Sequence, residues 1–163
     1  MDEKTLFILR GLQGSGKSTL ARRLKYDTYG CLVKKVICST DDFWVVGSGR
    51  KKAYTFNPIF LSEAHQWNLG RVAHHMHHGF DTIIVDNTNI YLQHMLAYIK
   101  LAEKAKYTVV MLQPDTEWAK NPKECYLKNS HGVPLEVIER NAREFEQVGE
   151  IAPYVYEITG KGI

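Results

Sequence analysis

The sequence has few cysteines, no long apolar run and no internal repeat, and each shortage argues against a class of protein. The three cysteines, Cys31, Cys38 and Cys125, are odd in number and have neither metal-ligand nor redox spacing, which argues against a disulfide framework. We expect reduced thiols in a cytoplasmic or nuclear compartment. The apolar runs are too short to span a bilayer, and the polar start shows no secretory signal pattern.

Size and charge set the remaining bounds. The chain has 163 residues, of which 44% are hydrophobic, and this suits one domain with a sizeable core. We expect a single domain over residues 1–163, either a whole protein or a piece excised from a longer one. The net charge of +3 permits a nucleic-acid partner without arguing for one, because local patches decide such binding.

Residues 11–19 carry the strongest functional signal. They read GLQGSGKST and match the pattern G-x-x-x-x-G-K-[ST], between an apolar run and a helical pattern. Glycines let the backbone wrap closely around a phosphate, while N–H groups and the helix N-terminus supply partial positive charge. Lys17 would reach the β- and γ-phosphates of ATP, and the Ser18 hydroxyl would bind Mg²⁺. The predicted ATP-binding residues are Gly14, Ser15, Gly16, Lys17, Ser18 and Thr19.

Short apolar runs alternate with helical patterns along the chain. Strands are expected at 6–9, 35–38, 82–86, 108–112 and 154–158. Helices are expected at 19–26, 58–78, 92–106 and 135–148. Repeated β-α units predict an α/β fold of the P-loop NTPase type, kinase class, with a parallel sheet covered by helices on both faces. Two irregular stretches, 46–53 and 121–134, are expected to be mobile.

Acidic residues follow two of the expected strands. Asp41 and Asp42 come directly after residues 35–38, and Asp86 ends residues 82–86. Ligands of an open parallel sheet bind beyond the carboxyl ends of its strands. One aspartate of the pair can therefore accept the proton of an acceptor hydroxyl, and Asp86 can help to hold Mg²⁺. Capping of the next segment and an Asx turn are the structural alternatives.

A lid over the transferring phosphate would carry a cation. The stretch 120–131 has lysines and one histidine but no arginine. Its basic residues are Lys120, Lys123, Lys128 and His131. The next helix adds Arg140 and Arg143, for which pairing with nearby glutamates at helical spacing is the alternative.

Two further clusters attract attention. Arg50, Lys51 and Lys52 are followed by Tyr54 and Phe56 and preceded by Trp44. Such a patch can follow a phosphate backbone and stack a base; a solvated basic loop with its aromatic rings in the core is the alternative.

The run HHMHH at 74–78 has an i, i+4 histidine pair suited to zinc, but we expect a solvated helix end because no further ligand has matching spacing.

Four segments in this order resemble the 5′-hydroxyl polynucleotide kinase family of P-loop kinases. They are FILRG and GKST within 7–19, STDDF at 39–43, DNTN at 86–89 and NSHGVP at 129–134. Nearest are the kinase-like domains of animal 2′,3′-cyclic-nucleotide phosphodiesterases and of NEDD4-binding proteins. The resemblance covers nearly the whole chain. It implies transfer of the γ-phosphate of ATP, with Mg²⁺, to 5′-hydroxyl ends of RNA or DNA in RNA end healing or repair.

The resemblance also implies roles for single residues. Asp41 corresponds to the general base, and Asp86, with Ser18, lies near the metal. Lys17 and Lys128 are the catalytic cations, although Lys128 stands where relatives have a lid arginine and so lacks its bidentate geometry. Trp44 replaces an arginine that grips nucleic acid in the phage-type enzyme, so nucleic-acid binding would rest on Trp44 stacking and on Arg50, Lys51 and Lys52.

Two other functions remain open. The chain can be a P-loop kinase of small molecules, or a nucleotide-binding interaction module with weak catalysis. The basic and aromatic stretch 46–56 favours a polymer over a metabolite, and the absence of a lid arginine favours the weak module.

Overall fold

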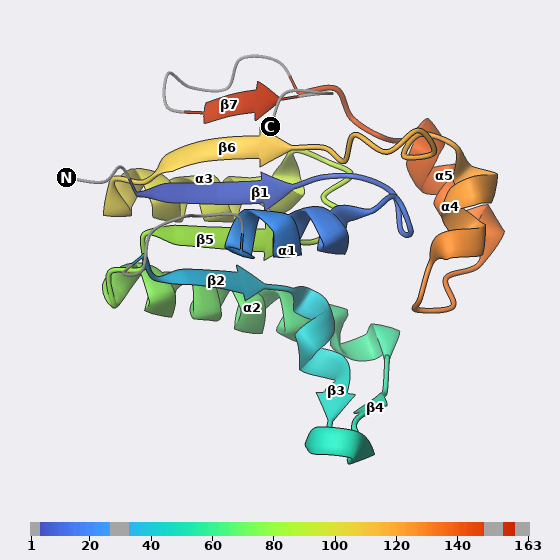
Figure 1. The fold of residues 1–163 in the computed structure, drawn as a ribbon, viewed down its shortest axis with the longest axis horizontal. Helices are drawn as coiled ribbons and strands as arrows, with labels where there is room; N and C mark the ends of the chain where they lie inside the picture. Colours follow the sequence, from blue (N-terminus) through green and yellow to red (C-terminus); the bar gives the residue numbers. More distant parts are fainter. Residues whose placement is uncertain (1–3, 27–32, 149–154, 159–163) are drawn as a thin grey trace.

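A computed structural model describes residues 4–26, 33–148 and 155–158. Its centre is a five-stranded sheet in the order β2-β5-β1-β6-β7, with every neighbouring pair parallel (Figure 1). The strands are β1 (Thr5–Leu9), β2 (Lys35–Cys38), β5 (Thr82–Asp86), β6 (Thr108–Leu112) and β7 (Val155–Ile158). Three of them, β2, β5 and β6, have the predicted bounds.

Helices cover both faces of this sheet, as predicted. On one face α1 (Lys17–Tyr26) places Leu20 and Ala21 against Leu9. On the other, α2 (Leu61–His77) and α3 (Gln93–Ala105) pack against Leu6 and Ile8. The alternation along β1 follows from the period of two in a strand, which points successive side chains to opposite faces. Of the described residues, no helix is long and apolar enough to cross a membrane.

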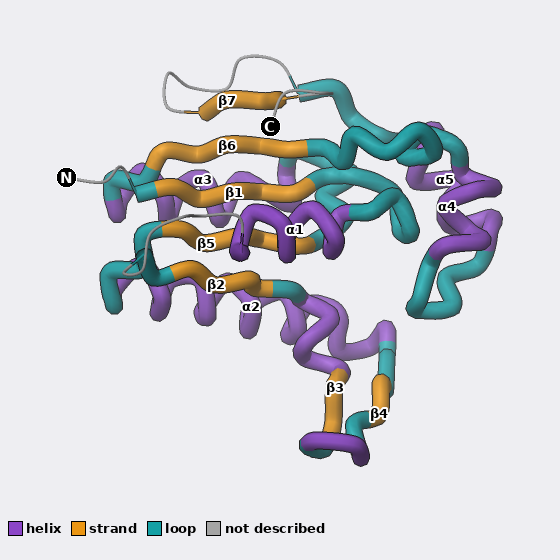
Figure 2. Tube along the Cα trace, in the orientation of Figure 1, coloured by secondary structure: helices purple, strands orange, loops and turns teal. Residues whose placement is uncertain are grey.

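Two small units stand beyond the carboxyl ends of the strands (Figure 2). One consists of α4 (Pro122–Lys128) and α5 (Leu135–Arg143), which share a small core with the first loop. The other begins with a 3₁₀ turn, η1 (Thr40–Trp44), and extends away from the sheet. Its outer part, residues 45–60, is called the arm below. The arm comprises β3 (Val45–Val46), η2 (Gly49–Lys51), β4 (Ala53–Tyr54) and η3 (Pro58–Phe60).

The structure corrects several predicted boundaries. Residues 46–53, expected as an irregular loop, include η2 and parts of a short antiparallel hairpin. Residues 121–134, also expected to be irregular, begin with α4, whose first turn is capped by the Asn121 side chain. The same Asn-Pro pair at Asn57 caps η3, so α2 begins at Leu61 rather than Pro58. The thiols of Cys38 and Cys125 are free and buried, and Cys31 lies outside the described residues.

Candidate nucleotide-binding and phosphoryl-transfer site

The phosphate loop, residues 11–19, joins β1 to α1 in a conformation that needs glycine. Gly14 and Gly16 have φ angles of 79° and 103°, a region that residues with a Cβ rarely adopt. At Gly14 an added Cβ would also lie 2.0 Å from the Cys125 carbonyl oxygen of α4. The glycines therefore permit both the wrapped backbone and its direct packing against α4.

Side chains from later in the chain hold this loop by its carbonyl groups. Trp118 Nε1 donates to the Gly14 oxygen at 3.1 Å, and Thr116 Oγ1 donates to the Ser15 oxygen at 2.8 Å. The Ser15 hydroxyl is buried and has no hydrogen-bond partner among the described residues. Buried polar groups are normally satisfied, so an unpaired hydroxyl inside a phosphate-binding loop fits a phosphate oxygen as its partner.

Lys17 is the buried cation of the site. Its Nζ donates to the Leu12 carbonyl oxygen at 2.7 Å. Burial lowers the pKa of Lys17 to about 8, although the negative charges of Asp86 and Asp41 partly oppose this effect. A triphosphate beside the ammonium would favour its charged form.

Asp86 lies at the end of β5, next to the first turn of α1. Burial raises the pKa of Asp86 above its usual range, whereas a hydrogen bond with Ser18 and the charge of Lys17 oppose the rise. A hydroxyl and a carboxylate oxygen are ligands suited to Mg²⁺, which keeps most of its remaining contacts with water and phosphates. Residues Ser18 and Asp86 therefore fit the predicted metal site.

The ends of β2 and β5 are tied together, and this positions Asp41. Ser39 Oγ donates to the Asp86 carbonyl oxygen at 3.0 Å and accepts from the Asp41 N–H at 3.2 Å. The Thr40 N–H donates to Asn87 Oδ1 at 3.0 Å. The Asp41 side chain is half exposed, so a hydroxyl from solvent can reach it. The fold thus brings Lys17, Asp41 and Asp86 to one edge of the sheet.

The two adjacent aspartates have different environments. Asp42 forms an ion pair with Arg71 at 2.8 Å, and Arg71 also donates to the Ser39 carbonyl oxygen. Asp41 instead accepts from the Tyr54 hydroxyl at 3.0 Å and lies 3.6 Å from His131 Nε2. Asp42 is thus engaged in holding η1 to α2, which leaves Asp41 as the candidate base.

The predicted lid cations lie at the surface. Lys128, at the end of α4, is exposed, and its Nζ lies 4.2 Å from the centre of the Trp118 ring. In the described part of the chain, neither Arg140 nor Arg143 forms an ion pair with a glutamate. The alternative of pairing with glutamates is therefore not seen for either arginine among these residues.

The aromatic residues around the basic cluster divide into two groups. Trp44 is only 3% exposed and packs edge-on against Phe43 and Phe56, so the prediction that it stacks a base is wrong: its faces are covered. Tyr54 and Phe56 are exposed, at 39% and 52%, and thus lie outside the core.

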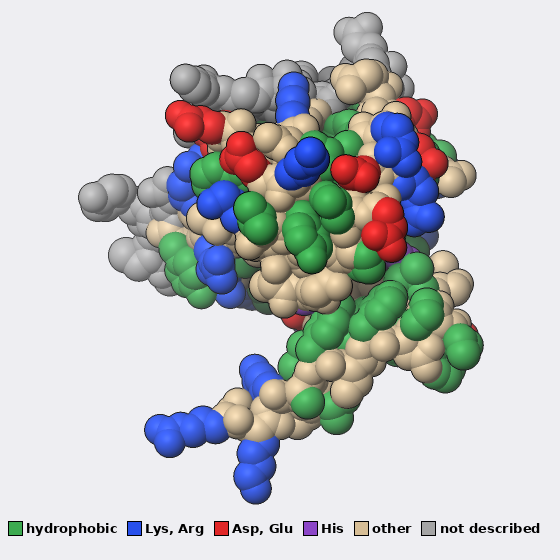
Figure 3. All heavy atoms as spheres, turned by 90° about the vertical axis from the view of Figure 1, so that its right-hand side faces the viewer, with side chains coloured by type: hydrophobic (Ala, Val, Ile, Leu, Met, Phe, Trp, Pro, Cys, Tyr) green, Lys and Arg blue, Asp and Glu red, His purple; other side chains and the backbone are tan. Residues whose placement is uncertain are grey.

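Arg50, Lys51 and Lys52 are exposed at the end of the arm, where basic side chains project into solvent (Figure 3). We call these three residues the basic tip. Residues 43–62 contain no aspartate or glutamate, so the arm carries charge of one sign only.

The histidine run behaves as a helix end. The rings of His74 and His78 lie 4.0 Å apart between centroids, and His78 Nδ1 contacts the His74 carbonyl oxygen. Across the described residues, no group of three or more His, Cys, Asp or Glu side chains is placed to hold a metal ion.

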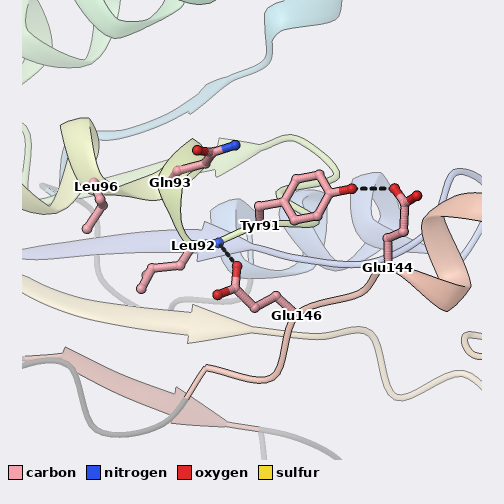
Figure 4. Close-up of a pocket in the computed structure, with 6 residues that line it drawn as sticks. All are labelled: Tyr91, Leu92, Gln93, Leu96, Glu144 and Glu146. Carbon is pink, nitrogen blue, oxygen red and sulfur yellow. Dashed lines mark hydrogen bonds between the residues drawn. The ribbon is translucent and has the colours of Figure 1, made fainter.

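A separate hollow of about 610 Å³ lies where α3 begins (Figure 4). Its two acidic side chains are already engaged: Glu146 accepts from the Leu92 N–H at 2.6 Å, and Glu144 accepts from the Tyr91 hydroxyl. Beside it, the buried Arg10 donates to the carbonyl oxygens of Ile90 and Glu146. These contacts fasten the segment after α5 to the sheet.

Comparison with known proteins agrees with the phosphate-loop geometry. The family described as an AAA domain matches residues 6–148. The chain belongs to this family. Among curated proteins, the chain is similar to human NEDD4-binding protein 2, to which it is 40% identical over 142 residues, or 87% of this chain and 8% of that protein. Mouse 2′,3′-cyclic-nucleotide 3′-phosphodiesterase is 34% identical over 115 residues, or 71% of this chain and 25% of that protein.

Solved structures show the same fold. Kti12 of Chaetomium thermophilum in complex with ADP-AlF₃ superposes with a TM-score of 0.59 at 15% identity, covering 94% of this chain and 88% of that one. A chain of the Pnkp1/Rnl/Hen1 complex gives 0.56 at 22% identity, covering 77% and 40%. This AAA-domain chain thus has a P-loop, kinase-like fold of the nucleotide-binding type. It spans 8% and 25% of the two curated relatives named above.

Two residues that contact Asp41 could not be identified from the sequence. Tyr54 was noted only as part of a basic patch, and His131 only as a lid cation, whereas both contact Asp41. They lie 13 and 90 residues from Asp41 along the chain, and no local pattern reports such contacts.

Proposed function

We propose that this domain transfers the γ-phosphate of ATP to the 5′-hydroxyl end of RNA or DNA, in RNA end healing or repair. One observation carries the proposal: hydrogen bonds of Ser39 and Thr40 hold the half-exposed Asp41 at the sheet edge where the phosphate loop buries Lys17. A buried cation for the donor phosphates thus stands beside an accessible carboxylate for an acceptor hydroxyl, as phosphoryl transfer requires.

In the proposed reaction, different residues act on ATP and on the acceptor hydroxyl. The loop N–H groups and Lys17 hold the β- and γ-phosphates, and Ser18 and Asp86 would hold Mg²⁺, which neutralises phosphate charge when bound. The acceptor hydroxyl gives its proton to an Asp41 oxygen, its own oxygen bonds to the γ-phosphorus, and the bond from that phosphorus to the β,γ-bridging oxygen breaks to release ADP. Lys128, leaving the Trp118 ring, adds positive charge to the γ-phosphate.

A polymer acceptor is favoured by the arm. The arm continues outward from η1, which contains Asp41, and ends in the basic tip (Figure 1), so a chain whose 5′ end reaches Asp41 can place later phosphates along it. We also propose that residues 1–163 form a single P-loop kinase domain that acts in the cytoplasm or nucleus.

The test uses γ-labelled ATP, Mg²⁺ and three acceptors: a 5′-hydroxyl RNA oligonucleotide, the same sequence as DNA, and free nucleosides. The same RNA with a 5′-phosphate is the matched control. We expect label on the 5′-hydroxyl polynucleotides only. Label on nucleosides alone would replace the proposal with a small-molecule kinase.

A weakly catalytic nucleotide-binding module is the second candidate. It is favoured by a specific observation: stretch 120–131 has no arginine, and the Nζ of its Lys128 lies over the Trp118 ring. ATP binding by calorimetry without label on any acceptor would establish it.

A further inference from the structure

Three segments meet at the carboxylate of Asp41. Tyr54 of β4 donates its hydroxyl to Oδ1 at 3.0 Å, and His131 Nε2 lies 3.6 Å from Oδ2. The rings of Tyr54 and His131 lie 4.9 Å apart between centroids and are tilted by 36°. Both oxygens of the candidate base are therefore contacted, one from the arm and one from the loop between α4 and α5.

The loop that carries His131 has a defined shape. We call residues 129–134 the lid loop. Asn129 Oδ1 accepts from the Val133 N–H at 2.9 Å, and Asn129 Nδ2 donates to the Tyr126 carbonyl oxygen at 2.8 Å. Gly132 completes the turn with a φ of 66°. His131 is thus presented to Asp41 by a closed turn.

The contacts of Tyr54 and His131 with Asp41 differ in how readily a ligand can displace them. Burial and the charge of Asp41 raise the pKa of Tyr54 well above its usual range, so its hydroxyl remains a donor to Oδ1. His131 is exposed, with 43% of its side-chain surface open to solvent, and exposed ion pairs contribute little to stability. The contact with Oδ2 is therefore the one that a ligand can displace.

His131 offers the same two groups as the end of a nucleic acid. A 5′-terminal nucleoside has a flat ring that stacks on aromatic faces and a hydroxyl hydrogen that a carboxylate can accept. His131 likewise sets a flat ring near the Tyr54 ring and directs a nitrogen at Oδ2.

We propose that Tyr54 and Asp41 form the subsite for the acceptor's terminal nucleoside, and that His131 fills this subsite until the acceptor displaces it. The inference rests on the proposed function, since it assumes that Asp41 receives a nucleic-acid hydroxyl. Tyr54 acts in two ways: its ring stacks the nucleoside, and its hydroxyl fixes the carboxylate so that Oδ2 faces the acceptor.

The test measures kcat and the acceptor KM for Tyr54→Leu, Tyr54→Phe and His131→Ala. We expect Tyr54→Leu to raise the KM for a 5′-hydroxyl oligonucleotide on the order of tenfold. Tyr54→Phe should keep this KM and lower kcat several-fold, because the ring remains while the hydrogen bond is lost. His131→Ala should lower the acceptor KM, and all three should leave the KM for ATP unchanged.

Matched controls are Tyr26→Leu and His77→Ala, which change exposed residues of α1 and α2. Tyr54→Leu behaving like Tyr26→Leu, or His131→Ala raising the acceptor KM, would overturn the inference while the kinase activity stands. Circular dichroism on each variant separates loss of fold from loss of the subsite.

The two proposals fail separately. If the wild-type protein labels no polynucleotide, the proposed function is wrong. In that case, binding at the subsite is measured without phosphoryl transfer, from the NMR signals of the His131 ring as adenosine is added. The subsite stands if those signals shift and Tyr54→Leu weakens the shift; it falls if they do not move.

Discussion

The proposed donor and acceptor halves of the site are built in opposite ways. The phosphate loop is packed against α4 and held through its carbonyl groups by Thr116 and Trp118. The acceptor side consists of η1, the arm and the lid loop, whose side chains are largely exposed. The proposed donor side is therefore shaped before any ligand binds, whereas the proposed choice of acceptor would depend on surface residues that few packing contacts fix.

Removing Lys17 should have the largest effect. We expect Lys17→Ala to reduce phosphoryl transfer by about 10²–10³-fold, because a fixed charge beside the transferring phosphate is lost. Single-turnover transfer rates measure this. Lys104→Ala, on the exposed face of α3, is the control, and equal rates for both variants would remove Lys17 from the mechanism.

The aspartate pair tests whether the acceptor half is catalytic. Asp41→Asn should lower kcat by about 10²–10⁴-fold, as expected for a lost general base, with ATP affinity nearly unchanged. Asp42→Asn is the matched neighbour, since it removes the charge that pairs with Arg71. Steady-state kinetics measure kcat and calorimetry measures ATP affinity for both variants. Equal losses in kcat would show that Asp41 is not the base.

Two glycines test the packing of the donor half. Gly14→Ala should lower the free energy of unfolding by roughly 1–3 kcal/mol, because its backbone conformation and the Cys125 carbonyl oxygen both oppose a Cβ. Gly70→Ala, in α2 with open space around it, should raise that energy by roughly 0.5–1 kcal/mol. Urea denaturation measures both, and a stable Gly14→Ala would mean that α4 packs more loosely.

Proton uptake tests the charge of Lys17. Its pKa of about 8 leaves the ammonium half protonated at pH 8, and bound phosphates favour the charged form. ATP binding should therefore take up about half a proton at pH 8 and almost none at pH 6. Calorimetry in buffers of different ionisation enthalpy measures the uptake. Lys17→Met should abolish it, and an unchanged uptake would assign the proton to another group.

The basic tip should give the smallest effect. Replacing Arg50, Lys51 and Lys52 together by alanine should raise the KM for an oligonucleotide a few-fold and lower the salt slope of binding by up to about two. Transfer to a free nucleoside, if any occurs, should not change. A salt slope equal to that of the wild type would leave the arm without a role in binding the phosphate backbone.

The fold could be predicted more fully than the site. Strands such as Thr82–Asp86 are β-branched and buried, so local composition fixed their bounds. The helix after Asn121 was missed although its capping signal was present. Trp44 was wrongly predicted to stack a base, because a residue beside an acidic pair can face either the core or solvent. Only its packing against Phe43 and Phe56 shows that it faces inward.

The close approach of Gly14 to the Cys125 carbonyl oxygen has a mechanical consequence. Since α4 rests directly on the phosphate-loop backbone, it cannot tilt as a rigid flap without pulling the donor site apart. The Asn129 nitrogen also lies against Gly14, so the proposed displacement of His131 would involve only the residues after Asn129. On the proposed function, acceptors would then exchange without disturbing the packing of α4 on the phosphate loop.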